Sequence, residues 1–427
     1  MKKIENPQRK DWNTILERPT KKIGDIEAIV NEVFADIHKN GDIAVSKYTK
    51  KFDNIALDSN LVSVSEIEEA IAIVPLELKE AIQLAKENIT KFHVAQKTEK
   101  VFVETTKGVS CWQEKRPIQK VGLYVPGGTA PLFSTVLMLA IPAQIAGCKE
   151  IVLCSPPNKE GKLPPAILYT ANLCGVTKII KMGGIQAIAA YTFGTATIPQ
   201  VHKIFGPGNQ FVTVAKQLAT KFGVAIDMPA GPSELLVVAD DSSNASYVAS
   251  DLLSQAEHGE DSQVILVSTS KKLIAAVSKE IEKQLVALPR IAIAQKAIQN
   301  SKSIFVENDE IALELINEYG PEHFIVCTKN NDFYIDNISN VGSVFIGNYT
   351  PESAGDYASG TNHTLPTNGF TKAYSGVNLD SFTKSITFQE ISKEGIQNIG
   401  KSIEVMAAAE GLQAHKNAVT LRLKDLN

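Results

Sequence analysis

Residues 120–155 read KVGLYVPGGTAPLFSTVLMLAIPAQIAGCKEIVLCS. Two short runs of aliphatic and β-branched residues, KVGLYV (120–125) and EIVLCS (150–155), enclose a longer apolar run that ends at Gly147. Strand-length runs that alternate with helix-length runs are typical of parallel strands joined by crossover helices. This stretch therefore predicts a strand–helix–strand unit of an α/β protein.

The alternation of strand-length and helix-length runs continues after residue 155 in two series. Further strand-like runs are KIIKM (178–182), HKIFG (202–206) and ELLVVA (234–239), followed by QVILVS (263–268), SIFVE (303–307), HFIVCT (323–328) and SVFIG (343–347). Repeated units of this kind predict a Rossmann-like layer. We expect an α/β fold with two incomplete Rossmann-like domains, one inserted in the other, an N-terminal helical arm and a C-terminal helical tail.

The expected domain boundaries follow from these series. Pro7 and Pro19 break any long helix near the start, and VFVETTKGVSCW (101–112) predicts a hairpin around Lys107-Gly108. The polar, helical end of the chain holds one possible closing strand, NAVTLRL (417–423). The parts are an arm (1–20), a first Rossmann-like domain with most metal and catalytic residues (21–120 and 235–375), a second Rossmann-like domain (121–234) and a tail (376–427).

Composition excludes several classes of protein. The chain has 427 residues, 44% of them hydrophobic, so it can bury a large core and is not mainly disordered. The formal net charge is −4, which argues against a nucleic-acid partner, and no apolar run reaches the roughly 18 residues of a membrane span. The polar start MKKIENPQRKDWN is unlike a secretory signal. Five cysteines without a CxxC pair fit a reducing cytoplasm better than a disulfide framework.

Three glycine-rich turns follow predicted strands in the 121–234 segment. They are Tyr124-Val-Pro-Gly-Gly-Thr-Ala-Pro, Gly183-Gly184-Ile-Gln186-Ala and Gly206-Pro-Gly208-Asn209-Gln. Ligands of open α/β sheets bind at the carboxyl ends of strands, where these turns should lie. None matches G-x-G-x-x-G, and each alone is explained as a tight turn. Three in one segment favour a ligand cleft.

Four residues could share a metal ion. Gln255 and His258 are three apart at the end of a predicted helix, so they lie on one helix face. Asp356 lies in a small-residue loop and His415 in the tail; together the four form a nitrogen and oxygen ligand set that zinc, manganese or cobalt accepts. Each also has a simpler explanation, as a helix-terminal, turn-capping or solvent-exposed residue.

The segment Tyr319-Gly-Pro-Glu322-His323 sets a carboxyl beside an imidazole at the start of a predicted strand. Such a pair can divide acid and base roles. Because consecutive strand residues point to opposite faces, both serve one site only if the pair lies on the preceding turn. A structural polar pair is the alternative.

Two further residues are candidates for the site. His363 either binds substrate or shapes its loop. Cys154, with no His or Lys beside it, is interpreted as a buried apolar residue rather than a nucleophile.

Taken together, these motifs resemble the histidinol dehydrogenase family. The matching strings run in order from residue 121 to 419. They are VGLYVPGGTAPLFSTVLMLAIPA, FGPGNQFVTVAK, AIDMPAGPSE, ASDLLSQAEHGEDSQVIL, YGPEHFIV, TPESAGDYASGTNHTLPT and AAAEGLQAHKNAV. They cover most of the chain, and we find no departure at a functional position.

The resemblance implies a zinc- and NAD-dependent oxidation of L-histidinol to L-histidine through L-histidinal. Two NAD⁺ and one water are consumed in this last step of histidine biosynthesis, and the enzyme is expected to be cytoplasmic. The resemblance also implies the residue roles. Zinc is bound by Gln255, His258, Asp356 and His415; Glu322 and His323 are catalytic; Tyr124, Gln186 and Asn209 contact NAD; Ser233, His363 and Glu410 contact substrate, together with the zinc ligands and His323.

The family is homodimeric, and by the same resemblance the tail reaches the partner, so that Glu410 and His415 serve the other subunit. Two other readings of the residues remain open. One is a zinc hydrolase in which Glu322 activates a metal-bound water and the glycine turns are structural. The other is a metal-stabilised structural dimer, which should unfold when zinc is removed.

Overall fold

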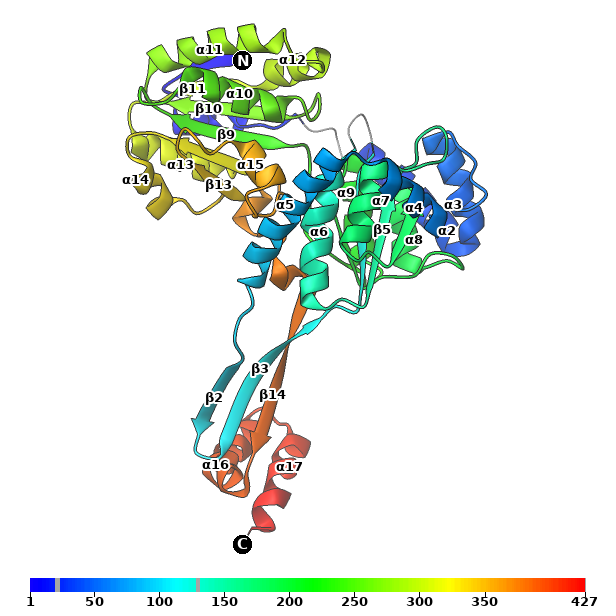
Figure 1. Cartoon of the computed structure of the whole chain (residues 1–427). Helices are drawn as coiled ribbons and strands as arrows, with labels where there is room; N and C mark the ends of the chain where they lie inside the picture. Colours follow the sequence, from blue (N-terminus) through cyan, green and yellow to red (C-terminus); the bar gives the residue numbers. More distant parts are fainter. Residues whose placement is uncertain (20–23, 128–130, 427) are drawn as a thin grey trace. The chain divides into compact units, whose positions relative to one another are not determined.

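The computed structural model describes residues 1–19, 24–127 and 131–426. The chain forms two compact units, drawn in Figure 1. The first comprises Met1–Ala95 and Ile118–Phe382, and the second comprises Gln96–Pro117 and Thr383–Asn427. The first unit holds two parallel sheets, which confirms the predicted α/β class with Rossmann-like layers.

A five-stranded parallel sheet forms the centre of one half of the first unit, with strand order β6-β5-β4-β7-β8. The strands are β4 (Lys120–Tyr124), β5 (Glu150–Ser155), β6 (Lys178–Lys181), β7 (Lys203–Phe205) and β8 (Ala225–Ile226). The helices between them are α6 (Phe133–Ala146), α7 (Pro165–Leu173), α8 (Gly184–Phe193) and α9 (Gln210–Thr220). The strand–helix–strand unit predicted over residues 120–155 is β4-α6-β5 and is confirmed.

A six-stranded parallel sheet forms the other half, with strand order β1-β11-β10-β9-β12-β13. Its strands are β1 (Lys2–Glu5), β9 (Glu234–Ala239), β10 (Gln263–Ser268), β11 (Lys302–Phe305), β12 (His323–Cys327) and β13 (Ser343–Ile346). Its helices are α10 (Ala245–Ala256), α11 (Lys271–Leu285), α12 (Ile291–Asn300), α13 (Asp309–Tyr319), α14 (Asn331–Asn337) and α15 (Glu352–Tyr357). The arm thus begins with edge strand β1, and its helical part is two short turns, Arg9–Asp11 and α1 (Trp12–Ile15).

Alternation along the strands explains why both faces of the six-stranded sheet are covered. Leu235 and Val237 of β9 pack into the cluster under α10, α11 and α12, whereas Leu236 and Val238 pack into the cluster under α13 and α14. Figure 1 shows these helices on opposite faces of the sheet. Strands buried on both faces need continuous apolar runs, and QVILVS and ELLVVA supply them.

The helices of residues 24–94 pack on the helices that cover the five-stranded sheet. They are α2 (Gly24–Asn40), α3 (Asp42–Tyr48), α4 (Val64–Ile73) and α5 (Leu76–Val94). Val30, Val33 and Phe34 of α2 share a buried cluster with Ile185 and Ile188 of α8. The sequence analysis grouped this segment with the other sheet. Helical spacing identifies an apolar face, but it does not specify the surface on which that face packs.

The second unit is a three-stranded antiparallel sheet with two helices. Its strand order is β14-β3-β2, with β2 (Val101–Thr106), β3 (Val109–Pro117), β14 (Thr383–Ile391), α16 (Lys393–Ala409) and α17 (Gln413–Lys424). The predicted hairpin at 101–112 is confirmed, with Lys107-Gly108 at its turn. The predicted closing strand at 417–423 is wrong, because these residues lie within α17. No helix of the described ranges is long and apolar enough to cross a membrane.

Candidate active site

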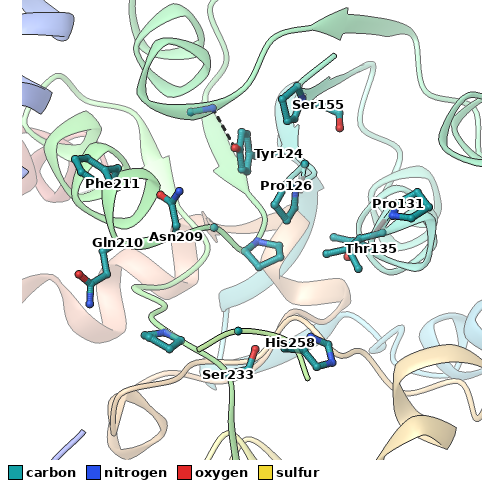
Figure 2. Close-up of a pocket in the computed structure, with 18 of the residues that line it drawn as sticks. Tyr124, Pro126, Pro131, Thr135, Ser155, Asn209, Gln210, Phe211, Ser233 and His258 are labelled. Carbon is teal, nitrogen blue, oxygen red and sulfur yellow. Dashed lines mark hydrogen bonds between the residues drawn. The ribbon is translucent and has the colours of Figure 1, made fainter. Parts of the chain in front are cut away.

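A cavity of about 960 Å³ lies between the two sheets of the first unit (Figure 2). The five-stranded sheet lines it with the carboxyl ends of its strands, where Tyr124 ends β4 and Asn209 follows β7. The six-stranded sheet lines it with the amino ends of its strands, where Ser233 precedes β9 and His323 begins β12. The expectation that ligands meet the carboxyl ends of strands therefore describes one wall of this cavity only.

Two of the three glycine-rich turns are held in place on the first wall. The Tyr124 hydroxyl accepts a hydrogen bond from the backbone N–H of Gly184 at 3.0 Å, drawn as a dashed line in Figure 2. Burial raises the pKa of Tyr124 to about 12, so the phenol stays protonated near neutral pH. The Asn209 side chain caps α9 by accepting from the Val212 N–H at 3.1 Å. Residues 128–130 of the remaining turn lie outside the described residues.

A buried ion pair fixes the turn that carries Asn209. Asp227 accepts from the N–H of Gly206 at 2.8 Å, and the Lys216 ammonium donates to the Gly206 carbonyl at 2.8 Å. Lys216 and Asp227 also pair with each other, and both side chains are almost fully buried. The N–H and the carbonyl oxygen of Gly206 are therefore both hydrogen-bonded to this ion pair.

Gln186, expected beside Tyr124, is buried behind the wall and does not itself line the cavity. Its amide nitrogen donates to Asp53 Oδ2 at 3.1 Å, and Asp53 does line the cavity. Burial raises the pKa of Asp53 to about 6, an effect that the hydrogen bond from Gln186 opposes. Asp53 was not predicted, because nothing in the local pattern connects it with Gln186, 133 residues further along the chain.

Glu322 and His323 lie together on the second wall. Glu322 is the last residue before β12, whereas His323 is the first residue of that strand and pairs with Leu235 and Ser343 in the sheet. Glu322 Oε2 is 3.6 Å from His323 Nδ1, and both side chains line the cavity. The expected condition, both residues on the preceding turn, is met by Glu322 only, yet the two side chains reach one cavity because they lie at the start of the strand.

Carboxylates surround the His323 imidazole. Nδ1 lies 3.7 Å from Glu352 Oε1, and Nε2 lies 3.7 Å from Asp356 Oδ1. Burial alone would lower the pKa of His323, but the Glu322 and Glu352 charges outweigh it and raise that pKa to about 10. Burial in turn raises the pKa of Glu352 to about 8, against the opposing effect of His323. Three carboxyl groups thus lie within 4 Å of one imidazole on this wall.

His323, Glu352 and Asp356 offer ligand atoms that all lie within 4.8 Å of one another. In the described part of the chain, His323 Nε2 and Glu352 Oε1 are buried without a hydrogen-bond partner. Buried polar atoms without partners are rare in folded proteins and often mark a missing ion or ligand. Glu352 was missed by the sequence analysis, although it precedes Asp356 by four residues on α15 and therefore shares its helix face.

The other predicted metal-site residues divide between the two units. Gln255, in the last turn of α10, and His258, in the turn that follows the helix, line the cavity with Asp356. The Gln255 amide nitrogen lies 3.1 Å from His323 Nδ1 and 3.3 Å from the Glu234 carbonyl, to which it donates. His415, on α17, belongs to the second unit.

The predicted substrate residues divide in the same way. Ser233 and His363 line the cavity. His363 Nδ1 donates to the Asp356 carbonyl at 3.0 Å, so its Nε2 is free to accept from the Thr135 hydroxyl at 3.2 Å. Burial lowers the pKa of His363, which favours this neutral form. Glu410, at the end of α16, is exposed and belongs to the second unit.

Cys154 is fully buried, and burial raises the pKa of its thiol to about 12. A thiol in this state is a poor nucleophile. The interpretation of Cys154 as a buried apolar residue is confirmed, and the wall chemistry comes from carboxylates, imidazoles and amides.

Comparisons with known proteins agree along the whole chain. The family described as histidinol dehydrogenase matches residues 16–423. A histidinol dehydrogenase of Bacteroides fragilis is 59% identical over 426 residues, covering 100% of both chains, and one of Bacteroides thetaiotaomicron is 56% identical with the same coverage. The crystal structure of histidinol dehydrogenase from Elizabethkingia anophelis superposes with a TM-score of 0.97 at 57% identity, covering 100% of this chain and 99% of that one.

Proposed function

The chain belongs to the histidinol dehydrogenase family and is an oxidoreductase of histidine biosynthesis, and we propose that it oxidises L-histidinol to L-histidine through L-histidinal with two NAD⁺ and one zinc ion per site. The observation that carries the proposal is the meeting of Glu322 and His323 with Asp356, Gln255 and His258 in one cavity. The opposite wall of that cavity carries Tyr124 and Asn209, and we infer that the dinucleotide binds along this wall.

The residues present fit a divalent cation. The buried Glu352 and the partly exposed Asp356 bring carboxylate oxygens to one place, and Gln255 and His258 line the same cavity with an amide and an imidazole. Zinc accepts nitrogen and oxygen ligands of this kind. A cation held there would offset the carboxylate charge that raises the pKa of His323 and so favour the neutral imidazole that accepts protons. We propose Gln255, His258 and Asp356 as ligands from one subunit and His415 as the ligand from its partner.

The reaction then divides between His323 and Glu322. When bound, zinc orients the amino and imidazole nitrogens of histidinol, and NAD⁺ accepts the hydride. His323 takes the hydroxyl proton as that hydride leaves carbon, which produces the aldehyde. Glu322 takes a proton from the water that adds to the aldehyde carbon, while His323 returns its proton to the aldehyde oxygen; this forms the hydrate and leaves His323 neutral. His323 then takes a hydroxyl proton of the hydrate while a second hydride leaves for a fresh NAD⁺, and the resulting carboxylic acid loses its proton to solvent.

Other side chains hold the reactants in the same proposal. Tyr124 and Asn209 contact NAD, and Gln186 acts behind them through Asp53. Ser233 and His363 contact histidinol from the first unit, and His363 is already oriented by Thr135 and the Asp356 carbonyl. Positioning of this kind is a principal source of enzymatic rate.

We also propose a homodimer in the cytoplasm, with Glu410 and His415 completing the partner's site. None of the residues of α17 is buried within the chain, and Val101, Phe102 and Val103 of β2 are exposed. Apolar surface of this kind marks an interaction site. All five cysteines are free thiols, which fits the cytoplasm.

The test is formation of NADH by purified protein from L-histidinol and NAD⁺, followed by absorbance before and after chelation. Roughly two NADH per histidinol, lost on chelation and restored by zinc, would support the proposal. Circular dichroism should show that the chelated protein stays folded, since a structural zinc site would unfold instead. A folded, zinc-loaded protein that forms no NADH would contradict the proposal and favour a zinc hydrolase.

Replacing Gly206 by alanine should weaken NAD⁺ binding by about tenfold or more. Gly206 has φ +125°, and an added Cβ would overlap the carbonyl oxygen of Tyr124. The turn with Asn209 must then move, at a cost of about 1–3 kcal/mol for strained backbone. Isothermal titration with NAD⁺ measures the change.

Gly223→Ala is the matched control for this prediction. Gly223 also has a positive φ, +84°, but nothing lies within 4 Å of its added Cβ. We expect it to lower stability by about 1 kcal/mol through backbone strain and to leave NAD⁺ affinity within twofold. Equal weakening in both variants would show that Gly206 matters only for folding.

A further inference from the structure

We propose that Arg18, from the N-terminal arm, is a positioning residue for the Glu322–His323 pair and acts through Glu234. This inference rests on the proposed function of that pair. Neither Arg18 nor Glu234 lines the cavity, so both would act through other residues. The contacts of Glu234 carry the argument.

The backbone of Glu234 touches three candidate site residues. Its N–H donates to Glu322 Oε2 at 2.9 Å. Its carbonyl oxygen accepts from Gln255 at 3.3 Å and lies 3.3 Å from His323 Nδ1. Any displacement of the Glu234 backbone would therefore change the orientation of the acid–base pair and of one proposed metal ligand together.

Arg18 holds the side chain of the same residue. The Glu234 carboxylate, only 3% exposed, accepts from Nε and Nη2 of Arg18, with the second of these bonds at 2.9 Å. It also accepts from the Asn368 N–H at 2.8 Å. Two parallel bonds from a guanidinium fix the plane of a carboxylate as well as its position.

The same guanidinium holds the turn that leads into the pair. Arg18 Nη2 donates to the carbonyl oxygens of Tyr319 at 2.8 Å and Gly320 at 3.3 Å, and the guanidinium lies 4.0 Å from the centre of the Tyr319 ring. Glu322 follows two residues after Gly320. In the sheet, His323 of β12 is paired with Leu235, the residue after Glu234. Arg18 therefore holds the start of β9 at Glu234 and the turn before β12, which carries Glu322 and leads into His323.

The positive charge of Arg18 also stabilises the ionised carboxylate of Glu234. Burial raises the pKa of Glu234, and Arg18 opposes that change through its hydrogen bonds and charge. Without the guanidinium, Glu234 would be a buried carboxylate beside Glu322 with no cation against it. A buried charge left without its partner is strongly unfavourable, so the local backbone would rearrange.

The experiment compares Arg18→Met and Arg18→Lys with a control in the same arm, Arg9→Met. Arg9 pairs with Glu314 at 3.2 Å on the surface and lies over the Trp12 ring, so it anchors the arm without contact to the site. We expect Arg18→Met to lower kcat about 10–100-fold with KM for histidinol changed less than threefold, and Arg18→Lys to recover part of the loss. Arg9→Met should keep wild-type kcat.

A double-mutant cycle separates positioning from simple stabilisation. Glu234→Gln keeps the backbone groups and removes the carboxylate charge. If Arg18 acts through Glu234, Arg18→Met in the Glu234→Gln background should cost far less than in the wild type, because no unpaired buried charge remains. Additive losses in kcat would overturn the proposal, as would Arg18→Met with normal kcat and a lowered Tm alone.

Chemical rescue covers the case in which Arg18→Met fails to fold. Arg18 lines a second cavity, together with Asn13 and Asn368, so the space left in Arg18→Ala should admit a small cation. Methylguanidinium should raise the kcat of this variant at least fivefold and methylammonium should not; no response to either overturns the proposal. Wild-type turnover tests the proposed function separately. If the wild type forms no NADH, the proposed function and the role of Arg18 both fail. If it does, the kcat ratios of the variants to the wild type test the role of Arg18 alone.

Discussion

Replacement of His323 by alanine is expected to lower kcat for histidinol oxidation by about 10²–10⁴-fold, the usual contribution of a positioned general base. His323 Nε2 is buried and without a hydrogen-bond partner in the described structure, and the side chain lines the cavity. Among the described residues, no other imidazole pairs with both Glu322 and Asp356, although His363 also lies 3.7 Å from Asp356, so no neighbour should replace His323. Steady-state NADH formation with saturating NAD⁺ measures the loss.

His202→Ala is the control, since His202 is exposed and does not line the cavity. It should keep kcat within twofold of the wild type. Near-normal turnover of His323→Ala would remove His323 as the base. The zinc content of that variant is equally informative: retained zinc agrees with Gln255, His258, Asp356 and His415 as ligands, whereas lost zinc would make His323 a ligand, as its grouping with Glu352 and Asp356 allows.

Replacement of Glu322 by glutamine should slow histidinal oxidation about 10²-fold or more and slow histidinol oxidation much less. The amide keeps an oxygen that can accept from the Glu234 N–H, so the turn should retain its geometry. It cannot take a proton from water, and only the second oxidation needs that step. Separate assays with histidinol and with histidinal, each by single turnover, measure the two rates.

Glu314→Gln serves as the matched control, because Glu314 is half exposed, pairs with Arg9 on the surface and does not line the cavity. It should leave both rates within twofold. Equal losses in the two half-reactions of Glu322→Gln would argue against water activation and for a general electrostatic role of Glu322.

Much of the fold was predictable because its signals are local. The β4-α6-β5 unit, the second series of strands and the hairpin at Lys107-Gly108 all follow from runs shorter than 20 residues. The condition that Glu322 and His323 both lie on the turn before the strand is met by Glu322 only, because His323 is the first residue of β12. The errors were also local. The segment 417–423 has apolar alternation of the strand type, but it continues α17, whose remaining residues favour helix.

The sequence by itself determined the α/β class, the family resemblance and the candidate residues, because each depends on residue type and spacing within one segment. Only the tertiary structure decided that helices α2–α5 pack on the helices of the five-stranded sheet, and that the cavity joins the carboxyl ends of one sheet to the amino ends of the other. It also brought Arg18 to Glu234, 216 residues away, and Asp53 to Gln186, 133 residues away. Such pairings depend on which apolar faces exclude water together, and the packing of the whole unit determines that choice.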